Sequence, residues 1–465
     1  RRSQFELFWT RLDGFEQAIK DAWVCDEAIV DPFKRLDALL RNTVVELQAW
    51  GQRKTGNIQI QMAIANFVIL RLDRAMETRA LSMGERWLRS LLKKVLLGLA
   101  SLQCMIERKS SSLSWIKEGD ANTKLFQAVA NGRRSKNFIP HIKHGDEIIT
   151  DPDHKGEIFT AAFEESLGQA REAGIDLDFL GYEASDLHDF EQIFSEDEVW
   201  ETIKGLPPDR APGPDGYIGA FYQRAWPIIK RDVMVVLLKL YVGDSRGFCR
   251  LNRAHIVLIP KKEDAEEIGD YRPISLPHST SKLFAKLLAN RVRRKMPEIV
   301  GANQSAFIIR QILHDNFLLV RQVARKIHAR KNPGVFLKLD ISKSFDSLSW
   351  PFLFEVLRVI GFGQKWIAWI AALLPTTNTK VIVNGVPGRS FTHAKGLRQG
   401  DPVSPLLFVI AMDVLSKIIS IAATEGVISS FLGISAMQRL FIYAYDIALF
   451  VRPSATDLQF VRQVL

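Results

Sequence analysis

An acidic residue between two short apolar runs near the end of the chain is the first candidate for chemistry. The stretch RLFIYAYDIALFVRP (439–453) places Ala444, Tyr445 and Asp446 between those runs. The pattern predicts a buried β-hairpin with a carboxylate near its tip. Hard divalent cations prefer carboxylate oxygen, and paired cations activate a hydroxyl and stabilise a leaving oxygen. Asp446 is therefore a candidate metal ligand.

A second carboxylate follows another predicted strand in VFLKLDISKSFDSLSWPFLFEVL (335–357). Alternating apolar residues form one face of a strand that ends at Asp340. A strand-end aspartate pointing into a cleft is a natural ligand for a divalent cation, whereas an isolated aspartate more commonly forms a turn. Further on, Ser349 predicts the N-cap of the next helix, with Pro351 in its first turn.

Basic residues supply a third candidate site. The run HIVLIPKK (255–262) predicts a strand that ends in Lys261 and Lys262, and YRPISL (271–276) brings Arg272. Lysines opposite an arginine would form a clamp for a triphosphate, which needs several fixed cations. Basic residues at strand ends are also commonly solvated, so both interpretations stay open.

A glycine-containing loop precedes the longest apolar stretch. In GLRQGDPVSPLLFVIAMDVLSKII (396–419), glycines around Gln399 predict a tight loop, with Ser404 capping a helix that starts at Pro405. Glycine at position 400 lets the backbone approach a base pair or a phosphate. The apolar stretch contains Asp413, so it predicts a buried helix and a soluble protein without a membrane span.

The overall composition indicates the size of the protein and the kind of partner that it suits. The chain has 465 residues and a net charge of +10, enough for two or three domains and suited to a polyanionic partner. Its three cysteines match neither a disulfide framework nor a metal knuckle, which favours an intracellular protein. Helical periodicity dominates residues 1–130, where we expect Trp9, Trp23, Trp50 and Trp87 to pack helices together.

The residue composition of the sequence changes near residue 190, where we expect a domain boundary. Ser195 begins a capping box, and APGPDG (211–216) predicts a rigid turn before an aromatic helix. The segment SWIKEGDANTKLFQAVANGRRSKN (114–137) carries basic residues beside aromatics; a nucleic-acid contact and a solvated basic turn are both open.

Each motif alone is weak evidence, but together, in this order and at this spacing, the motifs are specific for one family. The chain resembles the reverse transcriptase of non-LTR (LINE-type) retrotransposons, most closely the plant-genome branch. The resemblance runs from about residue 205 onward, and its motifs are APGPDG, IPKK…YRPISL, NQSAF…HDN, LKLDISKSFD and GLRQGDPVSPLLF. The part with SWIKEGDANTKLF is similar to the connector between an upstream endonuclease and the polymerase.

The resemblance implies a role for each matching residue. Asp340 and Asp446 match the catalytic aspartates that hold two Mg²⁺ or Mn²⁺ ions, with the backbone around Ile341 helping to hold the second. The nucleotide-binding positions implied are Lys261, Arg272, Phe345, Gln399 and Gly400. Phe345 matches the steric gate against the 2′-hydroxyl that separates RNA from DNA building blocks, which favours a DNA product.

Three departures from the family pattern stand out. The expected YADD reads YAYD, so Tyr445 replaces one metal-binding carboxylate and only Asp446 remains. In NQSAFIIRQILHDN (303–316) the usual basic, glycine-containing centre reads IIRQIL. The chain also resembles a fragment lacking endonuclease and thumb. These departures predict a degenerate, inactive copy.

The resemblance also implies the architecture and the partners. We expect an α+β fold: a mainly helical connector (1–190), polymerase fingers (191–335) and a palm of antiparallel sheet backed by helices (336–465). The implied function is RNA-directed DNA polymerase, with an RNA template, a DNA primer and deoxynucleoside triphosphates, inside the cell and by family in the nucleus.

The sequence also leaves other functions open. A non-catalytic, basic nucleic-acid-binding remnant and an unexpressed gene remnant are the alternatives outside catalysis. An RNA-dependent RNA polymerase is disfavoured by Phe345 and by the GLRQGDP loop.

Overall fold

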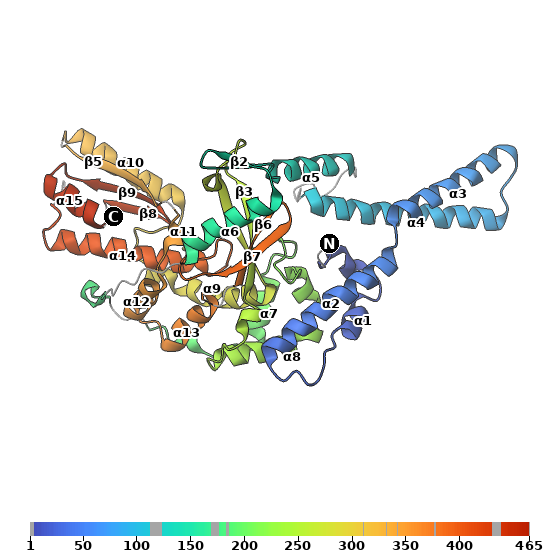
Figure 1. The fold of residues 1–465 in the computed structure, drawn as a ribbon, viewed down its shortest axis with the longest axis horizontal. Coiled ribbons are helices and arrows are strands. Elements are labelled where there is room, and N and C mark those ends of the chain that lie inside the picture. The colour runs from blue at the N-terminus through green and yellow to red at the C-terminus, as the bar shows by residue number, and fades with distance from the viewer. Residues whose placement is uncertain are drawn as a thin grey trace. The chain divides into compact units, whose positions relative to one another are not determined.

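The computed structural model describes residues 4–111, 123–168, 176–182, 186–309, 311–331, 333–341, 343–375, 378–429 and 439–464. Helices and strands are mixed along the chain, so the fold is α+β (Figure 1). Part of the predicted basic segment 114–137, including Trp115, lies outside the described residues.

Two compact units make up the chain. Unit 1 comprises Arg1–Ile148, Leu206–Val233 and Ile259–Tyr271, and unit 2 comprises Ile149–Gly205, Met234–Leu258 and Arg272–Leu465. Because the units are built from alternating stretches, no single position along the chain divides them. The functional division into connector, fingers and palm at residues 190 and 335 stays a prediction.

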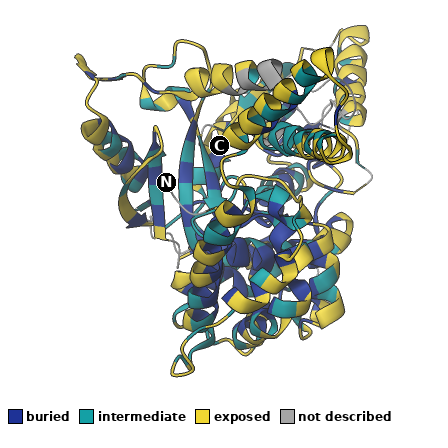
Figure 2. Ribbon diagram, turned by 90° about the vertical axis from the view of Figure 1, so that its right-hand side faces the viewer, coloured by how far each residue is buried: buried dark blue, intermediate teal, exposed yellow. Residues whose placement is uncertain are grey.

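Unit 1 is mainly helical. Its elements before residue 150 are η1 (Leu7–Arg11), α1 (Phe15–Ala22), α2 (Pro32–Thr55), α3 (Ile58–Thr78), α4 (Met83–Ser111), α5 (Thr123–Asn137) and a small hairpin of β1 (Ile142–His144) and β2 (Glu147–Ile149). Buried and exposed positions alternate along α1 and α2, as expected for amphipathic helices; Figure 2 colours the chain by this burial.

The predicted Pro/Gly turn at 211–216 is part of the core of unit 1. Gly216 has a φ of 81°, and its carbonyl accepts a hydrogen bond from the Phe5 N–H at 2.9 Å. The buried hydroxyl of Tyr217 donates to the carbonyl of Leu40 at 2.8 Å. Phe5 also contacts the ring of Phe221, with centroids 5.5 Å apart. The turn thus attaches residues 206–233 to the N-terminal helices.

The expectation that four tryptophans pack helices together holds for three of them. Trp9 is buried, Trp23 donates to Asp232, and Trp50 lies against Phe15. Trp87 is 65% exposed on α4, so the prediction for this residue was wrong. It lies in a helical hairpin, α3 and α4 side by side (Figure 1), which is too thin to bury both sides of each helix.

Unit 2 holds most of the remaining helices. They are α6 (Pro152–Gly168), η2 (Asp178–Leu180), η3 (His188–Glu191), α7 (Glu196–Lys204), η4 (Phe248–Arg250), α9 (Ser279–Ile299), α10 (Leu313–Ala329), α11 (Ser344–Ser347), α12 (Trp350–Ile360), α13 (Gln364–Leu373), α14 (Ser404–Thr424) and α15 (Ala455–Val464). The residues of α8 (Gly219–Tyr241) belong partly to each unit, and η5 (Ile268–Asp270) belongs to unit 1.

Two further sheets complete the fold. The first has the order β4-β3-β6-β7, formed by β3 (Arg253–Pro260), β4 (Tyr271–Pro277), β6 (Asn378–Val383) and β7 (Val386–Thr392). In it, β3 and β6 are parallel and β6 and β7 antiparallel. The second has the order β5-β9-β8, formed by β5 (Val335–Asp340), β8 (Leu440–Tyr443) and β9 (Asp446–Val451), and is antiparallel throughout.

The β5-β9-β8 sheet is covered on both faces. One face packs residues such as Ile442 and Ile447 against Ile419 of α14 and Val461 of α15. The other face packs Phe441 and Phe450 against α10. Strict alternation of side chains along each strand separates the two sets. The predicted hairpin and the predicted strand end at Asp340 are confirmed.

The apolar helix α14 lies mostly inside unit 2. Among the described residues it alone is long and apolar enough to cross a membrane, and 61% of that stretch is buried. The buried-helix prediction agrees with this burial. The predicted cap was one residue off: Val403 is the N-cap, so Ser404 and Pro405 are the first two helical residues.

Candidate functional site

The two candidate carboxylates lie directly opposite each other on neighbouring strands. Asp340, the last residue of β5, is the register partner of Asp446, the first residue of β9. Residues opposite each other on adjacent strands share one face of the sheet, with Cβ atoms about 5 Å apart. Both side chains are exposed. The antiparallel pairing therefore presents two acids to solvent at one end of the sheet.

Their position follows from the alternation of the strands. Asp446, Ala448 and Phe450 share a face, and the last two belong to the apolar cluster under α10. The acids lie beyond the end of that cluster, on the same face. Burial of the strands thus fixes the register, and the register fixes which face carries the carboxylates.

The turn that carries Tyr445 has two residues. Ala444 has a φ of 55°, and a positive φ at the first loop position is typical of tight hairpin turns. The Tyr445 side chain is 42% exposed. Its carbonyl accepts a hydrogen bond from the Ile341 N–H at 3.4 Å, which links the turn to the end of β5. Tyr445, which stands where the family has an aspartate, therefore has an exposed ring, while its backbone is held by this hydrogen bond.

The donor set suits one divalent cation better than two. Among the described residues, the only group of three close acidic, histidine or cysteine ligands is Asp176, Asp178 and Glu355, away from this sheet. No third ligand of that kind therefore completes a group with Asp340 and Asp446 in the described part of the chain. Two opposed carboxylates fit a hard cation, whereas a phenol is a poor ligand for Mg²⁺.

Phe345 is held from two sides. Its half-buried ring stacks on Phe408 of α14, with centroids 4.7 Å apart and ring planes at 16°. Its carbonyl accepts a hydrogen bond from the Leu397 N–H at 2.7 Å. A ring fixed in this way can act as a rigid wall, which a steric gate requires.

The loop of residues 396–401 is tied into unit 2 by its backbone. The Gln399 carbonyl accepts a hydrogen bond from the Ser275 N–H of β4 at 2.8 Å. Gly400 has a φ of +105°, and a Cβ there would lie 2.7 Å from the Ser275 carbonyl oxygen. Arg398 is buried and donates to the carbonyl of Leu373 at 2.5 Å. Glycine at position 400 is therefore a steric requirement.

The predicted cationic clamp falls on residues with different surroundings. Lys261 Nζ donates to the Gly269 carbonyl at 2.7 Å, and Lys262 Nζ lies 2.9 Å from Asp270 Oδ1. The hydrogen bond that Lys262 donates to the Asp270 carboxylate raises the pKa of Lys262. Both lysines and Arg272 are exposed; the lysines belong to unit 1 and Arg272 to unit 2.

The sequence reasoning missed the residues that hold the hairpin tip. Gln304 is fully buried, and its Oε1 accepts hydrogen bonds from the Ala444 N–H at 3.1 Å and the Ala306 N–H at 3.0 Å. The flanking backbone runs along β8: the Ile442 N–H donates to the Asn303 carbonyl at 2.9 Å. The signal was present in the NQSAF motif, but a polar residue in a loop shows no periodicity that would predict its partner.

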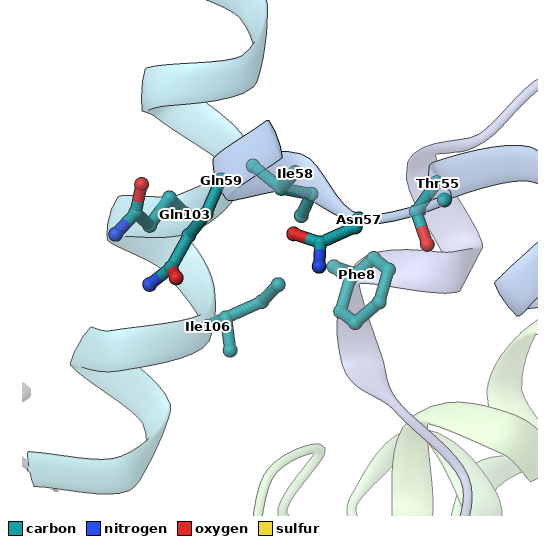
Figure 3. A pocket seen from close by; sticks show the side chains of 8 residues that line it. Phe8, Thr55, Asn57, Ile58, Gln59, Gln103 and Ile106 are labelled. Atoms are coloured by element: carbon teal, nitrogen blue, oxygen red, sulfur yellow. The ribbon is translucent and has the colours of Figure 1, made fainter. Parts of the chain in front are cut away.

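Two other features of the described residues are weaker candidates for chemistry than the strand-end acids. In the acidic group Asp176, Asp178 and Glu355, Arg358 Nη2 lies 2.6 Å from both Asp178 and Glu355, so a guanidinium is already paired with two of the three carboxylates. A hollow of about 450 Å³ in unit 1 is lined by Phe8, Asn57, Gln103 and neighbours (Figure 3). Its lining has no titratable side chain, so it offers no acid, base or metal ligand.

Comparison with known proteins agrees with this geometry. Residues 259–465 match the family described as "Reverse transcriptase (RNA-dependent DNA polymerase)". A "Transposon TX1 uncharacterized 149 kDa protein" of Xenopus laevis is 28% identical over 221 residues, covering 47% of this chain and 16% of that protein.

Two Pol polyproteins of retrotransposable elements are similar to the same degree. The type-2 element protein of Drosophila melanogaster is 29% identical, covering 48% of this chain and 21% of that protein. The type-1 element R2 protein of Popillia japonica is 29% identical, covering 52% of this chain and 32% of that protein. The chain thus spans about a third or less of the length of these relatives. An uncharacterized mitochondrial protein of Arabidopsis thaliana is 47% identical over 45 residues, 10% of this chain and 37% of that protein.

The strand-end acids and the glycine loop both lie within residues 259–465, the stretch that matches the reverse transcriptase family. The relatives include proteins of R2 and TX1 elements, so the matched stretch is similar to the reverse transcriptases of non-LTR retrotransposons.

Proposed function

We propose that this chain acts as the RNA-directed DNA polymerase part of a non-LTR retrotransposon protein, in a copy whose catalysis is impaired at Tyr445. One observation carries the proposal: Asp340 and Asp446 are register partners, exposed on one face at the end of an antiparallel sheet. This is the arrangement that nucleotide joining with divalent cations needs, and it lies inside the matched region.

The residues of the site take distinct parts in this proposal. When bound, Mg²⁺ or Mn²⁺ would supply activation of the primer hydroxyl and stabilisation of the leaving oxygens. Asp340 and Asp446 would hold it, with the backbone around Ile341 nearby. Phe345 excludes a 2′-hydroxyl, and the Gln399–Gly400 backbone lies against the nascent base pair.

The nucleic-acid partners follow from the same proposal. Lys261 and Arg272 contact the triphosphate of a deoxynucleotide. The RNA template and DNA primer are held by backbone charge and shape, consistent with a net charge of +10, since base pairing carries the sequence. The proposal also includes a right-hand polymerase with fingers and palm, membership of the plant-genome branch, and action in the nucleus. The 47% identity with the Arabidopsis thaliana protein supports the plant-genome branch.

Tyr445 is the expected weak point. Removing one carboxylate from a two-metal site removes an electrostatic contribution of several kcal/mol, or roughly a thousand-fold in rate. The phenol neither carries that charge near neutral pH nor matches the size of a carboxylate. The rest of the turn is intact, because Ala444 and Tyr445 keep their backbone hydrogen bonds.

The test is primer extension on a polyribonucleotide template with Mg²⁺, comparing this chain with Tyr445→Asp. We expect Tyr445→Asp to extend the primer about a thousand-fold faster, with deoxynucleotides preferred over ribonucleotides. Adding Asp340→Asn to the Tyr445→Asp protein should abolish that gain. Equal rates for the chain and for Tyr445→Asp would contradict the impairment.

A second candidate function is a non-catalytic nucleic-acid-binding module, favoured by the basic charge and by the missing carboxylate. Filter binding of an RNA–DNA duplex over a salt series, without nucleotides, separates the two functions. Binding that weakens steeply with salt, together with no extension by Tyr445→Asp, would support the module and overturn the polymerase.

A further inference from the structure

The segment Asn303–Ser305 pairs with the β8 strand of the β8–β9 hairpin through a single β-bridge and two backbone hydrogen bonds. Gln304 bridges to Ile442 of β8 in parallel orientation. The Ser305 N–H donates to the Ile442 carbonyl at 3.2 Å, and Asn316 Nδ2 donates to Ser305 Oγ at 2.7 Å. Motif residues that the proposed function leaves unused therefore lie along the strand that leads to the catalytic turn.

Gln304 makes the direct connection to the turn. Its side chain is 0% exposed, and its Oε1 accepts from two backbone N–H groups, those of Ala444 and Ala306. Ala444 is two residues before Asp446 and is the first residue of the turn. One buried oxygen thus joins the loop after residue 303 to the loop that carries the metal-binding position.

Strained backbone conformations occur close to Asp340, Asp446 and Gln304 in the sequence. Three of the non-glycine residues with left-handed backbone are Lys343, Ala444 and Phe307, with φ of 51°, 55° and 60°. Each lies within three residues of Asp340, Asp446 or Gln304. Such conformations are unfavourable for residues with a Cβ, and they persist where surrounding contacts fix them. The bond from Ala444 to Gln304 is a contact of that kind.

We infer that Gln304 is a positioning residue that sets the place of the Asp446 carboxylate opposite Asp340. Its oxygen fixes the left-handed turn at Ala444, and the turn determines where β9 begins. Removing the oxygen leaves two buried N–H groups without their acceptor and lets the turn relax. This inference rests on the proposed function, because the carboxylate pair is taken to hold a cation.

The substitution that tests it is Gln304→Met, which keeps the length of the side chain and removes the acceptor. The matched control is Ser305→Ala, which alters the next buried residue of the same segment and leaves the Ala444 bond in place. Both proteins are first compared with the unaltered chain by circular dichroism and thermal unfolding, to establish that each is folded.

Two measurements follow on all three proteins. Hydrogen exchange monitored on peptides across 441–448 reports protection of the turn. Titration with Mn²⁺, followed by electron paramagnetic resonance, reports cation affinity, with Asp340→Asn defining the part that belongs to the carboxylate pair. We expect Gln304→Met to lose protection of the turn and about ten-fold or more in Mn²⁺ affinity, as changes behind metal ligands do. Ser305→Ala should retain both.

The outcomes separate the inference from the function beneath it. Unchanged protection in Gln304→Met, or equal losses of affinity in Gln304→Met and Ser305→Ala, would overturn the positioning role alone. If Asp340→Asn leaves the Mn²⁺ affinity unchanged, the cation site of the proposed function is overturned, and the inference is overturned with it.

Discussion

The tip of the β8–β9 hairpin and the loop at residues 396–401 both carry motifs of the reverse transcriptase family, yet they are built in opposite ways. At the tip, Asp446 and Tyr445 are exposed and depend on a few backbone hydrogen bonds. In the loop, Arg398 and Asp401 are buried, and Gly400 is closely packed against Ser275.

The difference shows where a change in sequence is tolerated. A substituted side chain at the tip meets solvent, so it can remove chemistry without unfolding the protein. In the loop the burial of Asp401 raises the pKa of its carboxyl, and the Arg398 guanidinium 3.8 Å away opposes that rise. A changed residue there disturbs packing and charge together. The observed departure, Tyr445, falls in the tolerant region.

The strongest test of this comparison is Gly400→Ala. Alanine at a φ of +105° is strained, and its Cβ would lie 2.7 Å from the Ser275 carbonyl oxygen, which would displace the Ser275–Gln399 hydrogen bond. We expect the free energy of unfolding to fall by about 3 kcal/mol, combining backbone strain with the lost bond. Urea unfolding followed by tryptophan fluorescence measures the loss.

Gly385→Ala is the matched control. Gly385 also has a positive φ, +87°, but a Cβ there meets nothing within 4 Å. It should lose only the backbone contribution, about 1 kcal/mol. Equal losses at the two positions would mean that close packing of the 396–401 loop contributes nothing beyond strain, and the contrast with the tip would fail.

A second test uses pH to probe the buried side of the loop. His393 is 7% exposed, and burial, with a smaller effect from Arg398, lowers its pKa from 6.5 to about 3. Because the folded pKa lies below the unfolded one, the stability from neutral His393 is complete above pH 6.5. It is lost as pH falls from 6.5 towards 3, since the unfolded chain takes up the proton first.

We expect this loss to reach about 3 kcal/mol at pH 4. His393→Gln cannot titrate, so its unfolding free energy should fall less between pH 7 and pH 4 than that of the unaltered chain. His314→Gln, at an exposed histidine on α10, serves as the control and should follow the unaltered chain. If His393→Gln is just as sensitive to acid, His393 is not held neutral by burial.

Local patterns in the sequence were enough to predict the parts of the site. The alternation before Asp340 and the paired apolar runs around Tyr445 are local signals, and the three strands that they predict begin and end within one residue of the predicted positions. What brings Asp340 opposite Asp446 is long-range pairing. The family resemblance supplied that relation, because periodicity within either strand does not contain it.

The predictions that missed Gln304 and misplaced Trp87 also failed because local sequence patterns do not contain long-range contacts. Gln304 acts through one side-chain oxygen on a distant turn, and a single polar residue in a loop has no pattern from which that partner can be predicted. Trp87 was expected to pack helices together because an aromatic residue on an amphipathic helix usually faces a core. In a two-helix hairpin only one face of each helix is covered, so Trp87 stays exposed.

The smallest expected effect concerns the tip itself. Tyr445→Asp should change the free energy of unfolding by no more than about 0.5 kcal/mol, because the ring is 42% exposed and the hydrogen bonds of the turn belong to the backbone. Added Mg²⁺ should then raise the unfolding temperature of Tyr445→Asp more than that of the unaltered chain, since a ligand that binds the folded state stabilises it. Thermal unfolding with and without Mg²⁺ measures both effects. A loss above about 2 kcal/mol would show that the ring is part of the packing, and the tip would then belong with the loop as a region that does not tolerate change.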